Sequence, residues 1–284
     1  MNILSNVKFA LCALGIAAVL LGECAVLASE EALSGEAQLS ARKGGTLYFP
    51  SGDAMADVNQ ALIAARESKK LLLLVMGANW CHDSRALATR LFEEPLNTVI
   101  KAHYETIFVD VGYLDKGKEL ISHFGTPVYY ATPTVLIVDP ISGQLVNDGN
   151  RHQWGDASNI GMGESVEYFQ QMAVSAPGMS QNGEPADGDL DLLLLEIESY
   201  EQIQADRLYA AYAVIGPMLK AYKEGQSQEH FEDYWNEVRD FRLKVALDMD
   251  ALRLEARDRY ASGESEIKLK YPEYPGFSWE TQSQ

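Results

Sequence analysis

Short apolar runs alternate along the middle of the chain with segments in which apolar residues recur every three to four positions. A short, continuous apolar run is typical of a strand that is buried on both faces, whereas the longer repeat is typical of an amphipathic helix. This pattern predicts strands at residues 71–76, 105–111 and 134–138, and helices at residues 54–68, 96–103, 116–124 and 163–173.

Shorter features complete this part of the chain. We expect a strand to start at residues 46–49, and a turn after the last predicted strand to lead into a paired strand at residues 144–146. We also expect a helix that begins near Cys81 and is broken or kinked at Pro95. Strands that alternate with helices and end in a hairpin and a last helix predict an α/β layered domain over residues 44–173.

The C-terminal part of the chain has a different pattern. Residues 174–189 are rich in Gly, Pro, Ser and Asp, which predicts a linker. Two apolar stripes at helical spacing then predict a helical hairpin at residues 190–262, with a kink at Gly216-Pro217, and the rest, residues 263–284, is expected to be extended. We assign the apolar stripes to a hydrophobic core; the alternative is a ligand groove. We expect the hairpin to be removable without unfolding the α/β domain, unless it packs on the sheet.

The N-terminal segment has the order of features that is typical of a secretory signal peptide. Lys8 gives a positive start, residues 9–21 form an apolar run that is short for a membrane span, and small residues precede Ser29. We therefore expect a signal peptide at residues 1–28, a flexible leader at residues 29–43, and a periplasmic protein that meets the membrane only through the signal before cleavage. An uncleaved membrane anchor is the alternative.

Composition and charge narrow the classes of function. Apolar residues make up 47% of the chain, which is enough to form a folded core. The formal net charge of -18 would repel nucleic-acid phosphates, so we expect no nucleic-acid partner. The acidity either serves solubility or favours a basic partner.

The candidate chemistry centres on one cysteine. The chain has three cysteines, of which Cys12 and Cys24 leave with the predicted signal peptide, so the mature protein keeps Cys81 alone and forms no internal disulfide. Cys81 is predicted to start a helix directly after a buried strand, where unpaired backbone N–H groups favour the thiolate form of a cysteine. The alternative is that Cys81 is a small, buried, apolar side chain.

The residues around this cysteine suggest roles of their own. Ser84 lies one helical turn after Cys81, where its hydroxyl would donate to the thiolate, and Trp80 would shield one side of the sulfur. The Thr132–Pro133 bond precedes a predicted strand, and we expect it to be cis because X–Pro bonds are the ones in which cis is energetically accessible.

Metal binding is not indicated. His82 and Asp83 follow Cys81 directly, but adjacent residues point in different directions on a helix, and no C-x-x-C or H-x₃-H pair accompanies them. We therefore expect neither a metal nor a cofactor.

These motifs resemble the thioredoxin superfamily, and more closely its exported thioredoxin-like members. The resemblance rests on Trp80-Cys81-x-x-Ser84 after an apolar strand, on Phe92-Glu93-Glu94-Pro95, and on Thr132-Pro133-Thr134. It implies a thioredoxin-like fold over residues 44–173, ahead of the helical hairpin. It also implies that Trp80, Thr132 and Pro133 contact the substrate.

The sequence departs from that family at two positions. The resemblance places the family's second, resolving cysteine at Ser84 and its buried acid near Val75. It therefore implies a monothiol site, in which Cys81 attacks a disulfide and an outside thiol must resolve the mixed disulfide.

The predicted function is thus periplasmic, monothiol thiol–disulfide exchange on protein thiols or disulfides, with Cys81 and Ser84 as the catalytic residues. The alternative is a non-catalytic thioredoxin-like module that presents the C-terminal helices to a protein partner. A glutathione-using transferase is disfavoured, because the predicted export does not suit it and no acidic-Ser pair follows Pro133.

Overall fold

The computed structural model describes residues 47–150, 153–175 and 188–281. Of the chain's two units, Met1–Glu31 and Ala32–Gln284, all described residues belong to the second. The predicted signal peptide and leader, and residues 176–187 of the predicted linker, lie outside the described residues. None of the described helices is both long and apolar enough to cross a bilayer.

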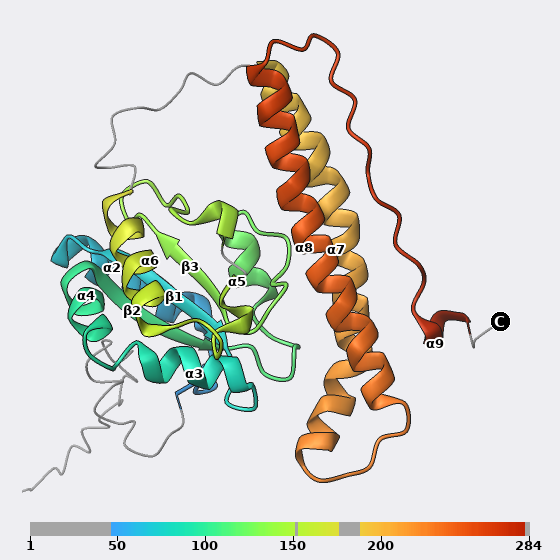
Figure 1. The fold of residues 1–284 in the computed structure, drawn as a ribbon. Helices are drawn as coiled ribbons and strands as arrows, with labels where there is room; N and C mark the ends of the chain where they lie inside the picture. Colours follow the sequence, from blue (N-terminus) through green and yellow to red (C-terminus); the bar gives the residue numbers. More distant parts are fainter. Residues whose placement is uncertain (1–46, 151–152, 176–187, 282–284) are drawn as a thin grey trace, which may run out of the picture. The chain divides into compact units, whose positions relative to one another are not determined.

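A mixed, three-stranded sheet forms the centre of the α/β domain (Figure 1). The central strand β1 (Leu71–Gly77) pairs in parallel with β2 (Tyr104–Asp110) and antiparallel with β3 (Thr134–Val138). Every residue of β1 is buried, as its continuous apolar run predicts for a strand that is covered on both faces.

Two layers of helices cover the sheet, and β1 feeds a separate hydrophobic cluster on each face. Leu72 and Leu74 pack in one cluster with α2 and α5, whereas Leu73 and Val75 pack in the other with α3, α4 and α6. This division follows from the alternation of side chains along a strand. The helices are α2 (Ala54–Ser68), α3 (His82–Arg90), α4 (Leu96–His103), α5 (Lys118–His123) and α6 (Met162–Val174).

Two predicted strands are absent from the described residues, because asparagine side chains take over backbone pairing. Residues 47–50 form no strand, and the backbone N–H groups of Leu47 and Tyr48 instead donate to Asn79 Oδ1 at 3.0 and 3.1 Å. Residues 144–146 contribute only an isolated bridge to β3. Asn147 occupies the edge there, where its side chain accepts from Ile137 N at 2.8 Å and donates to Val135 O at 2.9 Å.

The C-terminal part is a hairpin of two long helices, α7 (Gly188–Lys223) and α8 (Phe231–Ala261) (Figure 1). Helix α7 continues through Pro217. Gly216 marks a close approach: a Cβ at this position would lie 2.4 Å from the carbonyl oxygen of Tyr113. The tail after α8 has no regular structure until the short helix α9 (Ser278–Thr281).

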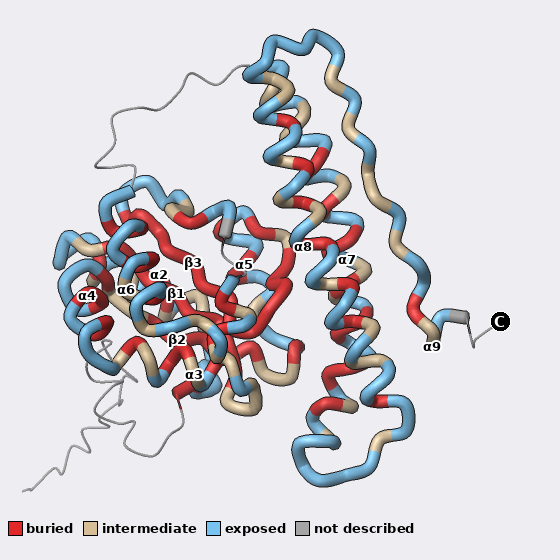
Figure 2. The backbone as a smooth tube through the Cα atoms, viewed as in Figure 1, coloured by how far each residue is buried: buried red, intermediate tan, exposed pale blue. Residues whose placement is uncertain are grey.

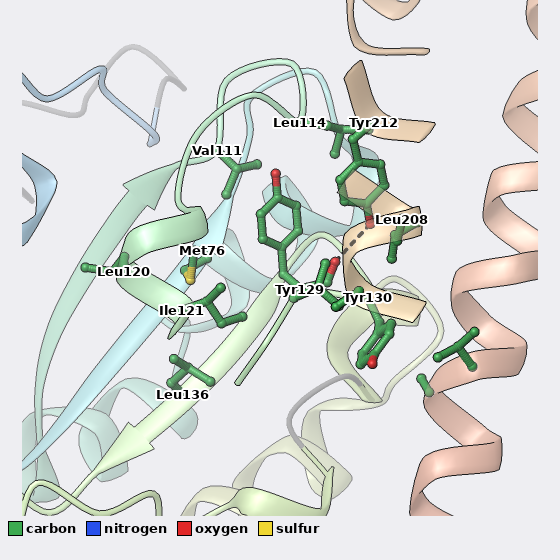
Figure 3. Close-up of a cluster of buried hydrophobic side chains, with 14 of the residues drawn as sticks. Met76, Val111, Leu114, Leu120, Ile121, Tyr129, Tyr130, Leu136, Leu208 and Tyr212 are labelled. Carbon is green, nitrogen blue, oxygen red and sulfur yellow. Dashed lines mark hydrogen bonds between the residues drawn. The ribbon is translucent and has the colours of Figure 1, made fainter. Parts of the chain in front are cut away.

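The hairpin shares its hydrophobic core with one face of the sheet. Figure 2 shows buried residues on the strands and recurring along α7 and α8. The rings of Tyr129 and Tyr212 stack with centroids 5.5 Å apart, and the Tyr212 hydroxyl donates to Tyr129 O at 2.9 Å (Figure 3). Tyr129, Leu208 and Tyr212 belong to one continuous cluster. The hairpin therefore packs on the sheet, which is the exception that the prediction named. With this packing we expect removal of the hairpin to destabilise the α/β domain.

Candidate functional site

Cys81 lies at the junction between the central strand and α3. It is the N-cap residue of α3, with an extended backbone (φ −84°, ψ 128°), and its side chain is half-buried. Its own N–H donates to Ala78 O at 3.1 Å, which closes the turn after β1. Because Cys81 immediately precedes the helix, its sulfur lies near the positive end of the helix dipole.

The segment before β3 brings its own groups to the sulfur. Cys81 Sγ donates to the carbonyl oxygen of Thr132 at 3.1 Å, and Thr132 Oγ1 donates to Sγ at 3.4 Å. Thr132 is buried, and the Thr132–Pro133 bond is cis. The two residues are 51 positions apart in the chain and meet because both lie at the same end of the sheet.

The hydroxyl of Ser84 has a different partner from the one predicted. Ser84 is fully buried, its Oγ accepts from Ala78 N at 3.3 Å, and its carbonyl accepts from the Tyr48 hydroxyl at 3.1 Å. None of the described hydrogen bonds joins it to Cys81. The predicted contact assumed that both residues were helical, whereas Cys81 has an extended backbone. Ser84 therefore holds the turn between β1 and α3.

Trp80 is fixed from both sides beside the cysteine. Its Nε1 donates to Gly112 O at 2.7 Å, and its ring stacks on Tyr113 with centroids 6.3 Å apart and an interplanar angle of 9°. The edge of a third ring, Trp235 of α8, completes the arrangement at 6.2 Å. The hairpin therefore contacts the residue that precedes Cys81.

The other residues of the motif point to structural roles. Asp83 accepts from Ser158 N at 2.9 Å, which ties α3 to the segment ahead of α6. Among the described residues, no group of His, Cys, Asp and Glu is arranged to hold a metal ion. Val75 is fully buried in β1, among apolar side chains.

A cavity of about 500 Å³ opens beside Cys81 and extends to the hairpin. Trp80, Cys81 and Thr132 line one side, and residues of α7 and α8 line the other. The hairpin side includes Tyr222, Lys223, Phe231, Trp235, Arg239 and Arg242. Sequence reasoning missed this cavity, because the aromatic residues on these helices have the spacing of core residues and nothing in the sequence aligns them with Cys81.

The comparisons with known proteins agree with this geometry. Residues 53–140 match a family model that is described as thioredoxin-like, and the match includes Cys81 and Thr132-Pro133. The chain contains a thioredoxin-like domain. The predicted fold class, an α/β thioredoxin-like domain followed by a helical C-terminal region, is confirmed.

The chain also matches a solved structure. The chain is 31% identical to a disulphide isomerase from Xylella fastidiosa Temecula1 over 44% of this chain and 95% of that one, with a TM-score of 0.40. A search of curated proteins found no match.

A buried ion pair between the two helices of the hairpin also contacts the thioredoxin-like domain through Tyr130. Glu201 of α7 is 1% exposed and forms an ion pair with Arg253 of α8. Its other carboxylate oxygen accepts from the Tyr130 hydroxyl at 2.7 Å. Tyr130 lies two positions before Thr132, so this ion pair anchors the segment that contacts Cys81.

Proposed function

We propose that this protein carries out thiol–disulfide exchange in the periplasm through Cys81, as a monothiol. The observation that carries the proposal is the position of Cys81 Sγ: half-buried at the start of α3, hydrogen-bonded to Thr132, and facing a cavity. The thioredoxin-like domain supports the proposal, and the signal-like first residues support the location.

The reaction starts when the thiol of Cys81 loses its proton to solvent. The sulfur then no longer donates to the Thr132 carbonyl, while Thr132 Oγ1 still donates to the sulfur. A hydrogen bond to a charged acceptor is stronger than one to a neutral acceptor, so the Thr132 hydroxyl stabilises the thiolate once it has formed. The freed Thr132 carbonyl is available to accept an N–H group from a bound peptide.

The thiolate attacks one sulfur of a substrate disulfide. A bond forms between Cys81 Sγ and that sulfur, the substrate S–S bond breaks, and the other substrate sulfur leaves as a thiolate. Ser84 has no thiol with which to attack the mixed disulfide. A second thiol, from the substrate or from a small thiol in solution, must therefore release Cys81.

The test is the reactivity of Cys81 in the folded protein. The alkylation rate of wild type should follow the thiolate fraction as pH rises, and Thr132→Val should react more slowly at neutral pH because the stabilising hydroxyl is lost. Thr98→Val is a matched control on the exposed surface of α4. Trapping in periplasmic extracts should yield mixed disulfides that Cys81→Ala does not form. An inert thiol in folded wild type would favour the non-catalytic module instead.

A further inference from the structure

The cavity beside Cys81 has a cationic and aromatic wall that belongs to the hairpin. Lys223, Arg239 and Arg242 line it, whereas its carboxylates are Asp83 and Glu232. Asp83 is held by the N–H of Ser158. In a chain with a formal net charge of -18, a cavity in which cations outnumber carboxylates is unusual.

Two of these cations have no carboxylate partner among the described residues. Arg239 lies 3.0 Å from Asp240, but neither Lys223 nor Arg242 forms an ion pair there. The Nε and Nη1 atoms of Arg242 are enclosed by protein without a hydrogen-bond partner. A charge that is partly withdrawn from water and not neutralised acts over a longer distance than an exposed, paired one.

The aromatic part of the wall links this charge to Trp80, the residue before Cys81. Trp235 meets Trp80 edge to face, and the Arg242 guanidinium lies 5.4 Å from the centroid of the Trp235 ring. A line of contacts therefore runs from the residue before Cys81 through Trp235 to Arg242. A ligand that fills the cavity meets the sulfur at one end and aromatic rings and cations at the other.

We propose that the hairpin wall selects disulfides that carry a carboxylate beside an apolar or aromatic group, with Arg242 and Lys223 as specificity-determining residues. This inference rests on the proposed function of Cys81 and names the substrate class for it. The carboxylate is drawn to the unpaired cations, and the apolar group packs against Trp235. The exchange step itself is unchanged, with the substrate's second sulfur leaving as a thiolate.

The experiment compares two aromatic disulfides that differ in charge. Dithiobis(nitrobenzoate) carries a carboxylate on each ring and dithiodipyridine carries none. The rate constant of each with Cys81 is measured at about 0.15 M salt, where the Debye length is about 8 Å and distant charges are screened. The ratio of the two rate constants is the readout, because a change in thiolate fraction affects both reagents alike.

Arg242→Met and Lys223→Met should each lower the anionic-to-neutral ratio by about threefold or more, as expected for loss of a unit charge several ångströms away. Arg257→Met removes an exposed charge farther along α8, outside the cavity, and should leave the ratio unchanged. Lys223 is exposed, so its variant tests the proposal even where Arg242→Met destabilises the fold.

A second arm separates the two sources of such a ligand. It uses short disulfide-linked peptides with Glu or Gln beside the cysteine. If the peptide with Glu reacts faster than the peptide with Gln, the ligand is an acidic peptide segment. If only the small reagents show a charge preference, the ligand is a small acidic thiol. One result overturns the inference while the proposed function stands: both aromatic disulfides react with Cys81, but neither they nor the peptides show a preference for the acidic member that Lys223→Met or Arg242→Met lowers. If neither reagent reacts with Cys81, the proposed function itself fails.

Discussion

The Tyr130 hydroxyl donates to a carboxylate oxygen of Glu201 at 2.7 Å, and this bond connects the hairpin to the segment that contacts Cys81. The second oxygen of Glu201 is paired with Arg253, and the carboxylate is almost fully buried. The hairpin therefore lines the cavity beside the cysteine and also anchors the backbone that holds Thr132 against the sulfur.

Replacing Glu201 by Gln should disturb both roles. Gln keeps an acceptor for Tyr130 but removes the charge that compensates Arg253, so the free energy of unfolding should fall by about 2–4 kcal/mol. We also expect slower alkylation of Cys81 and a changed pH profile of that alkylation, because the hydrogen bond of Tyr130 to a neutral amide is weaker than its bond to a carboxylate.

The measurements are urea unfolding and the pH dependence of alkylation. Glu198→Gln, an exposed neighbour on α7, is the matched control and should change neither. If Glu201→Gln were less stable but had the wild-type pH profile, Glu201 would be a structural residue without a positioning role.

The sequence predicts the α/β domain well where periodicity decides the structure. The continuous apolar run of β1 and the helical spacing of α2 depend on burial alone, and the predicted and observed elements agree closely. The strand predicted to start at residues 46–49 does not form over the described residues, because the N–H groups of Leu47 and Tyr48 donate to the side chain of Asn79, 32 and 31 positions away. No local pattern reveals such a partner.

The site is only partly accessible to sequence reasoning for a related reason. Cys81 and Thr132 each stand in a recognisable motif, so both could be named before their contact was observed. The cavity wall could not, because Trp235 and Arg242 lie on a helix whose stripes predict burial without saying against which surface. The contact between the hairpin and the sheet depends on residues such as Tyr129 and Tyr212, whose pairing is a tertiary feature.

Ser84→Cys should turn a poor reductase into a measurable one. A thiol at this position lies in the first turn of α3, three residues after Cys81, and resolves the mixed disulfide with an intramolecular advantage over thiols in solution. The gain should be partial, because Val75 offers no acid to deprotonate the new thiol, and a sulfur replaces the hydroxyl that accepts from Ala78 N.

The measurement is turnover of an insulin-type disulfide with a dithiol reductant, for wild type, Ser84→Cys and Cys81→Ala. The order expected is Ser84→Cys fastest and Cys81→Ala slowest. A folded Ser84→Cys that is no faster than Cys81→Ala would mean that Cys81 is not placed as a nucleophile.

Asp110, at the end of β2, should make stability depend on pH. Partial burial raises the pKa of its carboxyl group above the usual value of 3.8, against the opposing effect of the N–H of Gly112. The folded state therefore binds this proton more tightly than the unfolded state, so the contribution of Asp110 to stability falls as pH rises through the raised pKa.

Asp110→Asn should be as stable as wild type at low pH, where both carry a neutral side chain, and more stable than wild type at neutral pH. Urea unfolding across the acidic range checks this, with the exposed Asp258→Asn as a control that shows no such trend. A constant difference between Asp110→Asn and wild type at every pH would contradict the prediction.

Gly216→Ala tests the docking of the hairpin on the thioredoxin-like domain. In an isolated helix this change is favourable by about 1 kcal/mol, because Ala has the higher helix propensity. Here the added Cβ would lie 2.4 Å from the carbonyl oxygen of Tyr113, which is backbone and cannot rotate away. The helix must shift outward, and we expect a net loss of about 1–2 kcal/mol in the free energy of unfolding.

Gly163→Ala in α6 is the matched control: it is exposed, nothing lies within 4 Å of its Cβ, and it should be neutral or stabilising by up to about 1 kcal/mol. Because Tyr113 stacks on Trp80, the shift should also alter Trp fluorescence in Gly216→Ala and leave it unchanged in Gly163→Ala. Equal stability of the two variants would show that α7 does not pack against Tyr113 in solution.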